Sequence, residues 1–307
     1  MGGSASEVSR LATARPADSL GYVAEHAGEF DHFISLGAGP LSAEPGETPV
    51  IFSSSQAAGS LPRPKHEYGN VLICVAGTGE SKGFGVLARQ VGQSLDLPFD
   101  DVRCFPFYTY NEDGSIRREN ITDGAMARFS KHYNDPVISK WSIFDYVYGV
   151  LHHPAYPSIF ADDLKHDSPR IPFAPSFRDF QRAGQKLIEL HLHSDKLEPW
   201  QIEVVQIPKR PPGGGSARPV GPNADKTTLP ISPSLALAGI PPEAFEYRLG
   251  DRPAVEWLLE KMLVNDRDRP GDPQQIARLV GQWVRMSLET VNLVRTLPAL
   301  LPAERRP

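Results

Sequence analysis

Hydrophobic residues are distributed unevenly along the chain, and their pattern becomes regular only after about residue 66. The first 66 residues contain one amphipathic piece, roughly 17–33, followed by a stretch rich in Gly, Ser and Pro from Leu36 to Pro64. Such a stretch cannot bury enough apolar surface to fold by itself. We therefore expect a weakly ordered arm or linker over 1–66, one domain over 67–300 and an exposed tail over 301–307.

Apolar runs predict several strands in this domain. The run "NVLICVAG" (70–77) is almost continuously apolar, and "DVRCFPFYTY" (101–110) is rich in the aromatic residues that favour strands. Pro106 cannot donate a backbone hydrogen bond, so it indicates an edge or a bulge in the second run. Further strands are predicted at "QIEVVQIP" (201–208) and within "LPISPSLALAGIP" (229–241).

Helices are predicted where apolar residues recur every three or four positions after a capping residue. Thr122 can cap a helix that runs to about Tyr133, and two capping boxes, Ser142–Asp145 and Ser176–Asp179, open two more. This mixture of strands and helices favours a mixed α/β (α+β) fold, with a small mixed sheet and a helical lobe. Other helices are predicted at about 155–166, 253–263 and 273–297.

Composition changes this picture little. Hydrophobic residues make up 40% and charged residues 22% of the 307 residues, and the net charge is -5, which is typical of a soluble globular protein. A negative chain can still carry a local basic face, so the net charge does not exclude nucleic acid. The two cysteines, Cys74 and Cys104, lie in predicted strands, and we interpret them as small buried residues of a reducing compartment.

Targeting signals are missing from the sequence pattern. No apolar stretch approaches the ~20 residues that a bilayer-spanning helix needs. The first residues, "MGGSASEVSRLATARP", lack the apolar core of a signal peptide. We therefore expect a cytoplasmic protein.

One short motif favours an enzyme. Residues Gly79–Gly83 read G-E-S-K-G and match the G-x-S-x-G of a nucleophile elbow, with Ser81 as the nucleophile, provided that a strand precedes and a helix follows. A hydrolase of that kind also needs earlier parallel strands, which the sequence upstream does not supply. The alternative is a glycine-rich turn that presents Lys82. A phosphate-binding P-loop is rejected, because three of its four required positions do not match.

Histidines and aspartates gather at predicted helix ends. The segment His191–Asp195 resembles an H-x-H-x-D metal motif, but a capping or surface role is expected at a helix C-terminus. The pair His152–His153 is explained in the same way by its place before Pro154. Adjacent carboxylates diverge on a helix, so Asp162–Asp163 is expected on a solvated face. No metal site is predicted.

Basic residues interleaved with aromatic ones indicate a surface for DNA. Arginine and lysine contact phosphates, and arginine also reads guanine edges. Taken singly, most of these charges, Arg182 and Lys186 among them, are expected to be solvated. Residues 209–226 carry four basic residues against one aspartate and are predicted to form a flexible loop that contacts DNA or serves as a tether. The candidate DNA contacts are Ser81, Lys82, Arg117, Arg118, Lys209 and Arg210.

Several long strings resemble one family. They are "IFDYVYGVLHHPAYPSIFADDLKHDSPRIPF" (143–173), "FQRAGQKLIELHL" (180–192), "LAGIPPEAFEYRLGDRPAVEWLLEKM" (237–262) and "SLETVNLVRTLPAL" (287–300). These strings are similar to the C-terminal specificity domain of type ISP restriction–modification enzymes. The strings "NVLICVAGTGESKGFGVLA", "CFPFYTY" and "ENITDGAMARF" fit the start of the same domain.

The resemblance implies a target-recognition domain that grips duplex DNA, reads base edges and makes no covalent bonds itself. In the family this domain follows a nuclease, an ATP-driven translocase and an adenine methyltransferase in one polypeptide. S-adenosylmethionine, ATP and Mg are therefore expected in other domains, and no cofactor is expected in this chain. The partners implied are double-stranded DNA and the methyltransferase and helicase segments of the same system.

The chain departs from that plan. It has no Walker motif, no DEAD/DEAH box and no N-P-P-Y/F/W methyltransferase motif, and it runs quickly from "FISLG" to "RPKHEYGN" where the family carries a further block. We expect a detached or truncated specificity domain. Two alternatives stay open: a serine hydrolase that uses Ser81, and a remnant or protein-interaction module without DNA binding.

Overall fold

The computed structural model divides into two compact units. Unit 1 comprises residues Met1–Ile188 and Pro298–Pro307, and unit 2 comprises Glu189–Leu297, so the boundary falls within one helix, α7 (Phe177–Leu192). The residues that the structure describes are 35–36, 70–76, 83–90, 102–110, 117–166, 169–207, 227–263 and 272–301. Within these residues, no helix combines the length and the apolar character that crossing a membrane requires.

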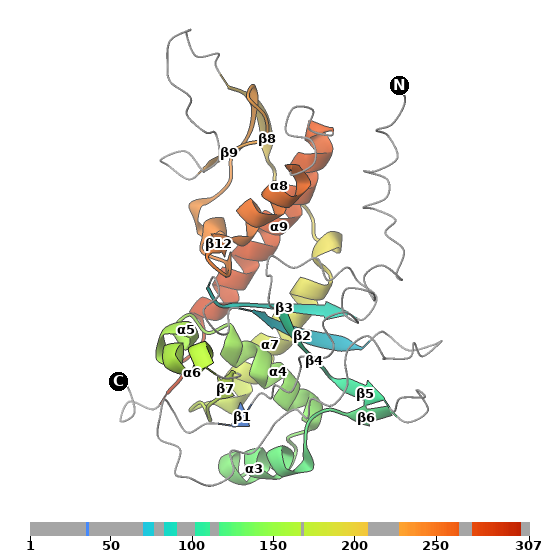
Figure 1. Cartoon of the computed structure of the whole chain (residues 1–307), viewed down its shortest axis with the longest axis vertical. Coiled ribbons are helices and arrows are strands. Elements are labelled where there is room, and N and C mark those ends of the chain that lie inside the picture. The colour runs from blue at the N-terminus through green and yellow to red at the C-terminus, as the bar shows by residue number, and fades with distance from the viewer. Residues whose placement is uncertain are drawn as a thin grey trace. The chain divides into compact units, whose positions relative to one another are not determined.

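A three-stranded antiparallel sheet lies in unit 1, in the order β3-β2-β4 (Figure 1). Its strands are β2 (Val71–Ala76), β3 (Gly85–Gln90) and β4 (Val102–Pro106). The central strand β2 is almost entirely buried, which agrees with its continuous apolar run. Strand β4 ends at Pro106 on the edge of the sheet, where a missing N–H is tolerated, as predicted.

The two cysteines are free thiols that lie opposite each other in this sheet. Cys74 pairs with Cys104 in the register of β2 and β4, and their Sγ atoms are 3.3 Å apart. Hydrogen bonding between the two thiols, together with burial, raises the pKa of the Cys74 thiol well above its ordinary value. Both cysteines were predicted to be small buried residues. Cys74 is buried as predicted, whereas Cys104 is only half-buried.

The remaining strands of unit 1 form two small pairs. A hairpin joins β5 (Tyr108–Tyr110) to β6 (Arg117–Glu119), and β1 (Ser35–Leu36) pairs in parallel with β7 (Arg170–Ile171). The predicted mixed α/β class is confirmed. The strands are distributed over several small sheets of two or three strands each.

Helix starts in unit 1 follow the capping pattern with one exception. The Thr122 hydroxyl accepts from the Ala125 N–H at 3.1 Å, and Ser176 donates to Asp179 at 2.6 Å, as predicted. The predicted Ser142–Asp145 box is wrong, because Ser139 caps this helix and Ser142 is its third residue. The helices are α3 (Asp123–Tyr133), α4 (Lys140–Leu151), α5 (Tyr156–Ile159), α6 (Ala161–His166) and α7.

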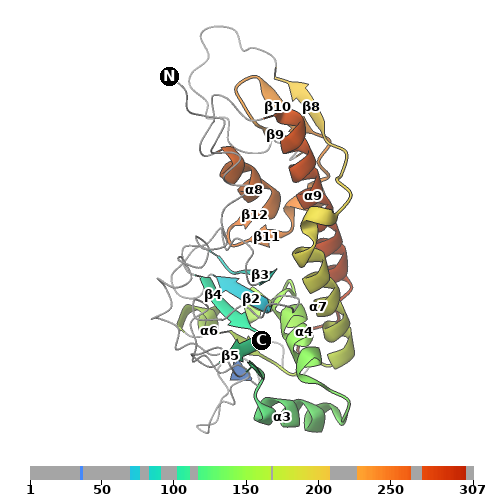
Figure 2. The same ribbon diagram turned by 90° about the vertical axis from the view of Figure 1, so that its right-hand side faces the viewer.

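Two glycines let α4 and α7 pack with their backbones in contact. A Cβ atom on Gly184 of α7 would lie 1.8 Å from the Asp145 carbonyl oxygen, and one on Gly149 of α4 would lie 2.3 Å from the Phe180 carbonyl oxygen. Figure 2 shows the two helices side by side. Any side chain larger than hydrogen at these positions would force the helices apart.

The carboxyl group of Asp145 lies beside this crossing. It is only 9% exposed, and Gln181 donates to its Oδ2 at 3.2 Å. Burial raises the pKa of Asp145 to about 6, although the hydrogen bond from Gln181 acts in the opposite direction. The sequence pattern predicts Asp145 as the last residue of a capping box at the start of the helix, whereas in the structure it lies buried in the middle of α4.

Buried tyrosine hydroxyls attach the segment between α6 and α7 to the core of unit 1. The Tyr146 hydroxyl donates to the Pro172 carbonyl and accepts from the Ala174 N–H, both at 2.7 Å. The Tyr156 hydroxyl donates to the Arg170 carbonyl at 2.8 Å. The largest fully buried side chains of the unit are Tyr146, Tyr148, Tyr156, Phe107, Phe129, Phe144, Phe160, Phe180 and Ile73.

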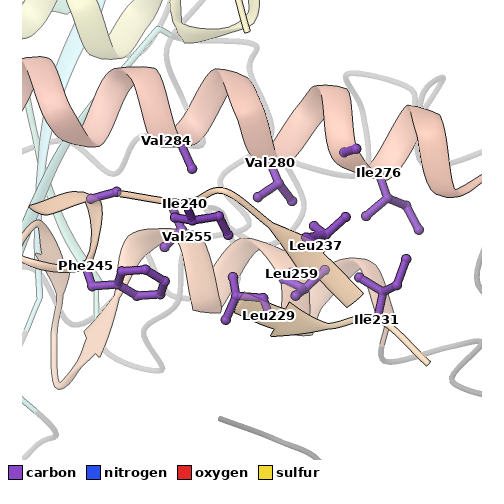
Figure 3. Close-up of a cluster of buried hydrophobic side chains, with 12 residues drawn as sticks. Leu229, Ile231, Leu237, Ile240, Phe245, Val255, Leu259, Ile276, Val280 and Val284 are labelled. Atoms are coloured by element: carbon purple, nitrogen blue, oxygen red, sulfur yellow. The ribbon is translucent and has the colours of Figure 1, made fainter. Parts of the chain in front are cut away.

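Unit 2 encloses an aliphatic core (Figure 3). Its antiparallel sheet has the order β8-β10-β9, from β8 (Glu203–Gln206), β10 (Leu235–Ala238) and β9 (Thr228–Pro230). Helices α8 (Ala254–Leu263) and α9 (Pro273–Arg295) complete it, with the short pair β11 (Arg248–Leu249) and β12 (Arg252–Pro253). The core residues are Leu229, Ile231, Leu237, Ile240, Ala244, Phe245, Val255, Leu259, Ile276, Ala277, Val280 and Val284.

Helix α9 is held to the chain that precedes β8. A Cβ atom on Gly281 would lie 2.5 Å from the Trp200 carbonyl oxygen, and the Trp200 N–H donates to the Gly281 carbonyl at 3.0 Å. The buried amide of Gln282 donates to the carbonyls of Asp195 and Leu197. Glycine at 281 therefore permits a backbone contact that directional hydrogen bonds then fix.

Candidate nucleic-acid interface

The β5–β6 hairpin carries Arg117 and Arg118, the two predicted DNA contacts that the structure describes. In the antiparallel register Arg117 lies opposite Tyr110 and Arg118 opposite Thr109, and all three residues of β6 are exposed. Successive residues of a strand point to opposite faces. The two arginines therefore lie on different faces of the hairpin, and a ligand on one face meets only one of them.

Two buried asparagines attach the hairpin to the rest of unit 1. Asn70 donates from Nδ2 to the Tyr108 carbonyl at 2.5 Å, and its Oδ1 accepts from the Tyr108 N–H at 2.8 Å. Asn120 donates from its backbone N–H to the Phe107 carbonyl at 2.7 Å and from Nδ2 to the Pro106 carbonyl at 3.0 Å. These four hydrogen bonds satisfy buried polar groups and fix the base of the hairpin.

Aromatic rings support Arg117. Its guanidinium carbon lies 4.4 Å from the centroid of the Tyr108 ring, which is within the range of a cation–π interaction. Next to Tyr108, the ring of Trp141 stacks on the buried Phe107 with 3.6 Å between centroids, and Trp141 remains 38% exposed. The hairpin thus presents an oriented guanidinium and a partly exposed aromatic surface.

Two carboxylates near the hairpin lie within ion-pair distance of a lysine at the start of α4. The Lys140 Nζ lies 2.6 Å from Oδ1 of Asp123 and 4.0 Å from Oε2 of Glu119. Hydrogen bonding and the charge of Lys140 lower the pKa of Asp123. The cationic side chains that the strands of the hairpin itself contribute are Arg117 and Arg118.

The other four predicted contacts, Ser81, Lys82, Lys209 and Arg210, lie outside the described residues, so they stay predictions. Two described strands flank Ser81 and Lys82 in the sequence. Strand β2 ends at Ala76 and strand β3 begins at Gly85, and these two residues pair with each other.

The ends of β2 lead to two different regions. Ala76 is at the end that flanks residues 77–84, whereas Leu72, near the other end, pairs with Pro106, after which the chain enters the hairpin. A six-residue strand is about 17 Å long from first to last residue at 3.4 Å per residue. The flanks of residues 77–84 therefore lie at the end of the sheet away from the hairpin.

The prediction that a helix follows the strand before Ser81, as a nucleophile elbow requires, is wrong. An elbow needs a strand, a tight turn and then a helix. Here β2 is followed by β3, an antiparallel strand that pairs with it along its full length. The run "GVLARQ" of β3 is short and apolar, a pattern that does not distinguish a strand from a helix. The serine hydrolase alternative loses its main structural support.

The expectation of a solvated Asp162–Asp163 pair is wrong for one member. Asp162 is exposed, but Asp163 is 5% exposed and lies 2.9 Å from the Arg170 guanidinium. A buried carboxylate that stays ionised needs a cation or hydrogen bonds to replace its lost hydration. Here the cation comes from β7, four residues after α6 ends, and the ion pair has a structural role.

The expectation of a capping or surface role for His191–Asp195 is also wrong in part. His193 is exposed and its Nδ1 lies 3.1 Å from the Glu189 carbonyl, as a capping role requires. His191 is 1% exposed, and its Nε2 lies 2.9 Å from the Thr290 hydroxyl of α9. The part of the chain that the structure describes holds no group of three or more His, Cys, Asp or Glu side chains placed to bind a metal ion.

A family model decides where this chain belongs. The model of the Type ISP C-terminal specificity domain matches residues 56–290, which is most of the chain. The chain belongs to this family. The resemblance seen in the sequence strings is confirmed, and the domain is called the specificity domain from here on.

Solved structures agree with the family assignment. The specificity domain is 33% identical to a chain of the DrdV–DNA complex determined by cryo-electron microscopy, with a TM-score of 0.65, covering 80% of this chain and 26% of that chain. It is 28% identical to a nuclease-deletion mutant of the Type ISP restriction–modification enzyme LlaGI in complex with a DNA substrate mimic, with a TM-score of 0.54, covering 78% and 18%.

A more distant structure supports the fold alone. The ATP-dependent Type ISP restriction–modification enzyme LlaBIII bound to DNA is 22% identical, with a TM-score of 0.58, covering 81% of this chain and 17% of that chain. The specificity domain thus spans about a quarter or less of the length of these structures. No match was found among curated proteins.

Proposed function

We propose that this specificity domain recognises a duplex DNA target for a Type ISP-like restriction–modification system. Catalysis would come from other segments or another chain, which would also bind S-adenosylmethionine, ATP and magnesium. The observation that carries the proposal is the match of the family model over residues 56–290. The relatives of known structure that support it were solved with DNA or a DNA mimic.

The β5–β6 hairpin is the part of the described surface best suited to this function. Arg117 and Arg118 can donate bidentate hydrogen bonds to phosphates or to guanine O6 and N7. The partly exposed Trp141 beside Tyr108 adds an aromatic surface that can pack on a sugar or a base. The buried asparagines hold these groups in place before DNA arrives, which reduces the entropy lost on binding.

A salt titration tests the proposal. The full chain is bound to a fluorescein-labelled duplex and its affinity measured by anisotropy at several salt concentrations. We expect binding at low salt, with a slope of log K against log[salt] that becomes less steep by about one for each phosphate contact removed. The variants are Arg117→Gln and Arg118→Gln, singly and together, because the two side chains lie on different faces.

The matched control is Arg128→Gln with Lys131→Gln, which removes the same charge from two exposed positions of α3. The proposal predicts a larger loss for the hairpin variants than for this control. Absence of duplex binding by the unmodified chain at low salt, with co-purification of a methyltransferase–helicase chain instead, would mean that the domain is an interaction module.

A further inference from the structure

The solvent face of α7 carries a row of positive charge apart from the hairpin. Arg178, Arg182 and Lys186 follow one another at intervals of four residues, and the last two are exposed. Residues four apart lie on one side of a helix. The opposite side of α7 is apolar, with Phe180 and Leu187 fully buried. The three cations therefore form one row along the outer side of this helix.

The three cationic side chains in this row differ in whether they form an ion pair. Arg178 lies 2.5 Å from the Asp135 carboxylate, and the hydrogen bond from the Val137 N–H together with this ion pair lowers the pKa of Asp135. Within the described residues, neither Arg182 nor Lys186 has a carboxylate within ion-pair distance. Two like charges four residues apart repel each other and weaken a helix. Asp179 and Glu189 lie three residues from Arg182 and Lys186 on the same helix, but neither forms an ion pair with them, so both cationic groups stay available to a ligand.

These two cations sit on a rigid support. Gly184, which lies between them in sequence, faces the opposite way and contacts the backbone of α4 at Asp145. Helix α7 is consequently held against α4 directly behind Arg182 and Lys186. Side chains on a fixed helix lose less freedom on binding than side chains on a loop, and they keep a constant spacing.

We propose that Arg182 and Lys186 contact phosphates of the bound duplex, and that α7 is a second, sequence-independent DNA surface in addition to the hairpin. This inference rests on the proposed function. Residues four apart are separated by about 6 Å along the helix axis. One strand of B-DNA carries a phosphate about every 3.4 Å of axis, so the pair spans about two phosphates. Arg178 adds less, because Asp135 already neutralises it.

The test compares Arg182→Gln/Lys186→Gln with Arg128→Gln/Lys131→Gln in the full chain. Both double variants remove one arginine and one lysine from exposed helical positions of unit 1. Affinity for a duplex and for its sequence-scrambled version is measured by anisotropy between 50 and 200 mM salt. Circular dichroism and melting temperature check that each variant folds.

We expect the α7 variant to lose affinity for both duplexes to the same extent. The fall in affinity between 50 and 200 mM salt should become roughly tenfold smaller than in the unmodified chain, as loss of two phosphate contacts predicts. The control should keep the original salt dependence. A loss confined to one duplex would show base reading and would overturn the assignment to phosphate.

Three results separate this inference from the proposed function. If the unmodified chain binds duplex and the α7 variant keeps its affinity and slope, α7 is not a DNA surface while the proposed function stands. If both double variants lose affinity equally, the effect is one of net charge and the assignment to α7 is wrong. If the unmodified chain binds no duplex at low salt, the proposed function fails and this inference fails with it.

Discussion

The two compact units of the specificity domain are filled by different kinds of side chain. The core of unit 1 is built on large rings, among them Tyr146, Tyr156 and Phe129, whereas the buried cluster of unit 2 is aliphatic except for Phe245, with Tyr247 buried outside that cluster. A tyrosine in a core must place its hydroxyl against a partner, but leucine and valine have no such requirement. The core of unit 1 therefore requires hydrogen bonds in fixed directions as well as the right volume, whereas the buried hydrogen bonds of Gln282 and His191 in unit 2 lie outside its aliphatic cluster.

This difference coincides with the location of the candidate DNA contacts that the structure describes. The hairpin and the row of charges on α7 belong to the described residues of unit 1, where backbone contacts and buried hydrogen bonds fix the supporting elements. An aliphatic core tolerates repacking as long as its volume is kept. We infer that substitutions should affect unit 1 more sharply than unit 2, and four measurements can test this.

The largest effect is expected at the crossing of α4 and α7. Gly184→Ala places a methyl group against the Asp145 carbonyl, so the free energy of unfolding should fall by about 3 kcal/mol or more. Gly124→Ala in α3 is the matched control, because nothing lies within 4 Å of the added atom, and it should gain up to about 1 kcal/mol from helix propensity. Urea denaturation measures both, and equal stabilities would refute the close crossing.

The buried carboxyl group of Asp145 should make stability depend on pH. Its folded pKa of about 6 is above the ordinary value of 3.8, so its favourable contribution is present below pH 3.8 and is lost as pH rises through 6. A shift of this size corresponds to up to about 3 kcal/mol. Asp145→Asn removes the titration, so the variant should gain stability relative to the unmodified chain between pH 4 and pH 7.

Subtracting the two stability curves isolates Asp145, since the histidines are common to both proteins. His152 changes stability with pH in the opposite direction to Asp145, because burial lowers the pKa of His152 to about 4. A difference that stays constant from pH 4 to pH 7 would show that the Asp145 carboxyl is solvated.

Loss of one tyrosine hydroxyl should have a smaller but clear effect. Tyr146→Phe keeps the ring and leaves the Pro172 carbonyl and the Ala174 N–H without their partner, which should reduce stability by roughly 1–3 kcal/mol. Hydrogen exchange followed by mass spectrometry should show faster exchange in residues 169–176. Unchanged protection of this segment would mean that the hydroxyl does not hold it.

The smallest effect is expected in unit 2. Leu259→Met changes the shape of a side chain in the aliphatic core while nearly keeping its volume, so stability should fall by less than about 1.5 kcal/mol. A loss as large as that of Tyr146→Phe would mean that the two cores are equally demanding, and the contrast drawn here would be wrong. The same denaturation experiment provides the comparison.

The sequence predicted local features better than distant contacts. Thr122 and Ser176 were recognised as caps because the relevant partners lie within three residues. Ser142 was misassigned because Ser139 offers a competing start one turn earlier. The burial of Asp163 and His191 depends on Arg170 and Thr290, and no periodicity within one helix reveals partners from other elements.

The candidate site was predicted in part. Arg117 and Arg118 were expected on an exposed surface and are exposed, but their placement on opposite faces follows from the strand register. Arg182 and Lys186 were expected to be solvated singly, since a sequence does not show whether acidic partners lie nearby. The role of Asn70 was missed, because a single asparagine before a strand carries no signal for a partner 38 residues away.

Asn70 has a consequence for how new targets could arise. Its side-chain amide binds the carbonyl and the N–H of Tyr108, and both are main-chain groups that every residue except proline possesses. These two hydrogen bonds therefore do not depend on which side chains the hairpin carries. If the hairpin contacts DNA as proposed, exchange of side chains in β5 and β6 would alter the DNA site that is preferred while the hydrogen bonds of Asn70 stay intact. The preference for a DNA site would then diverge faster than the fold that supports it.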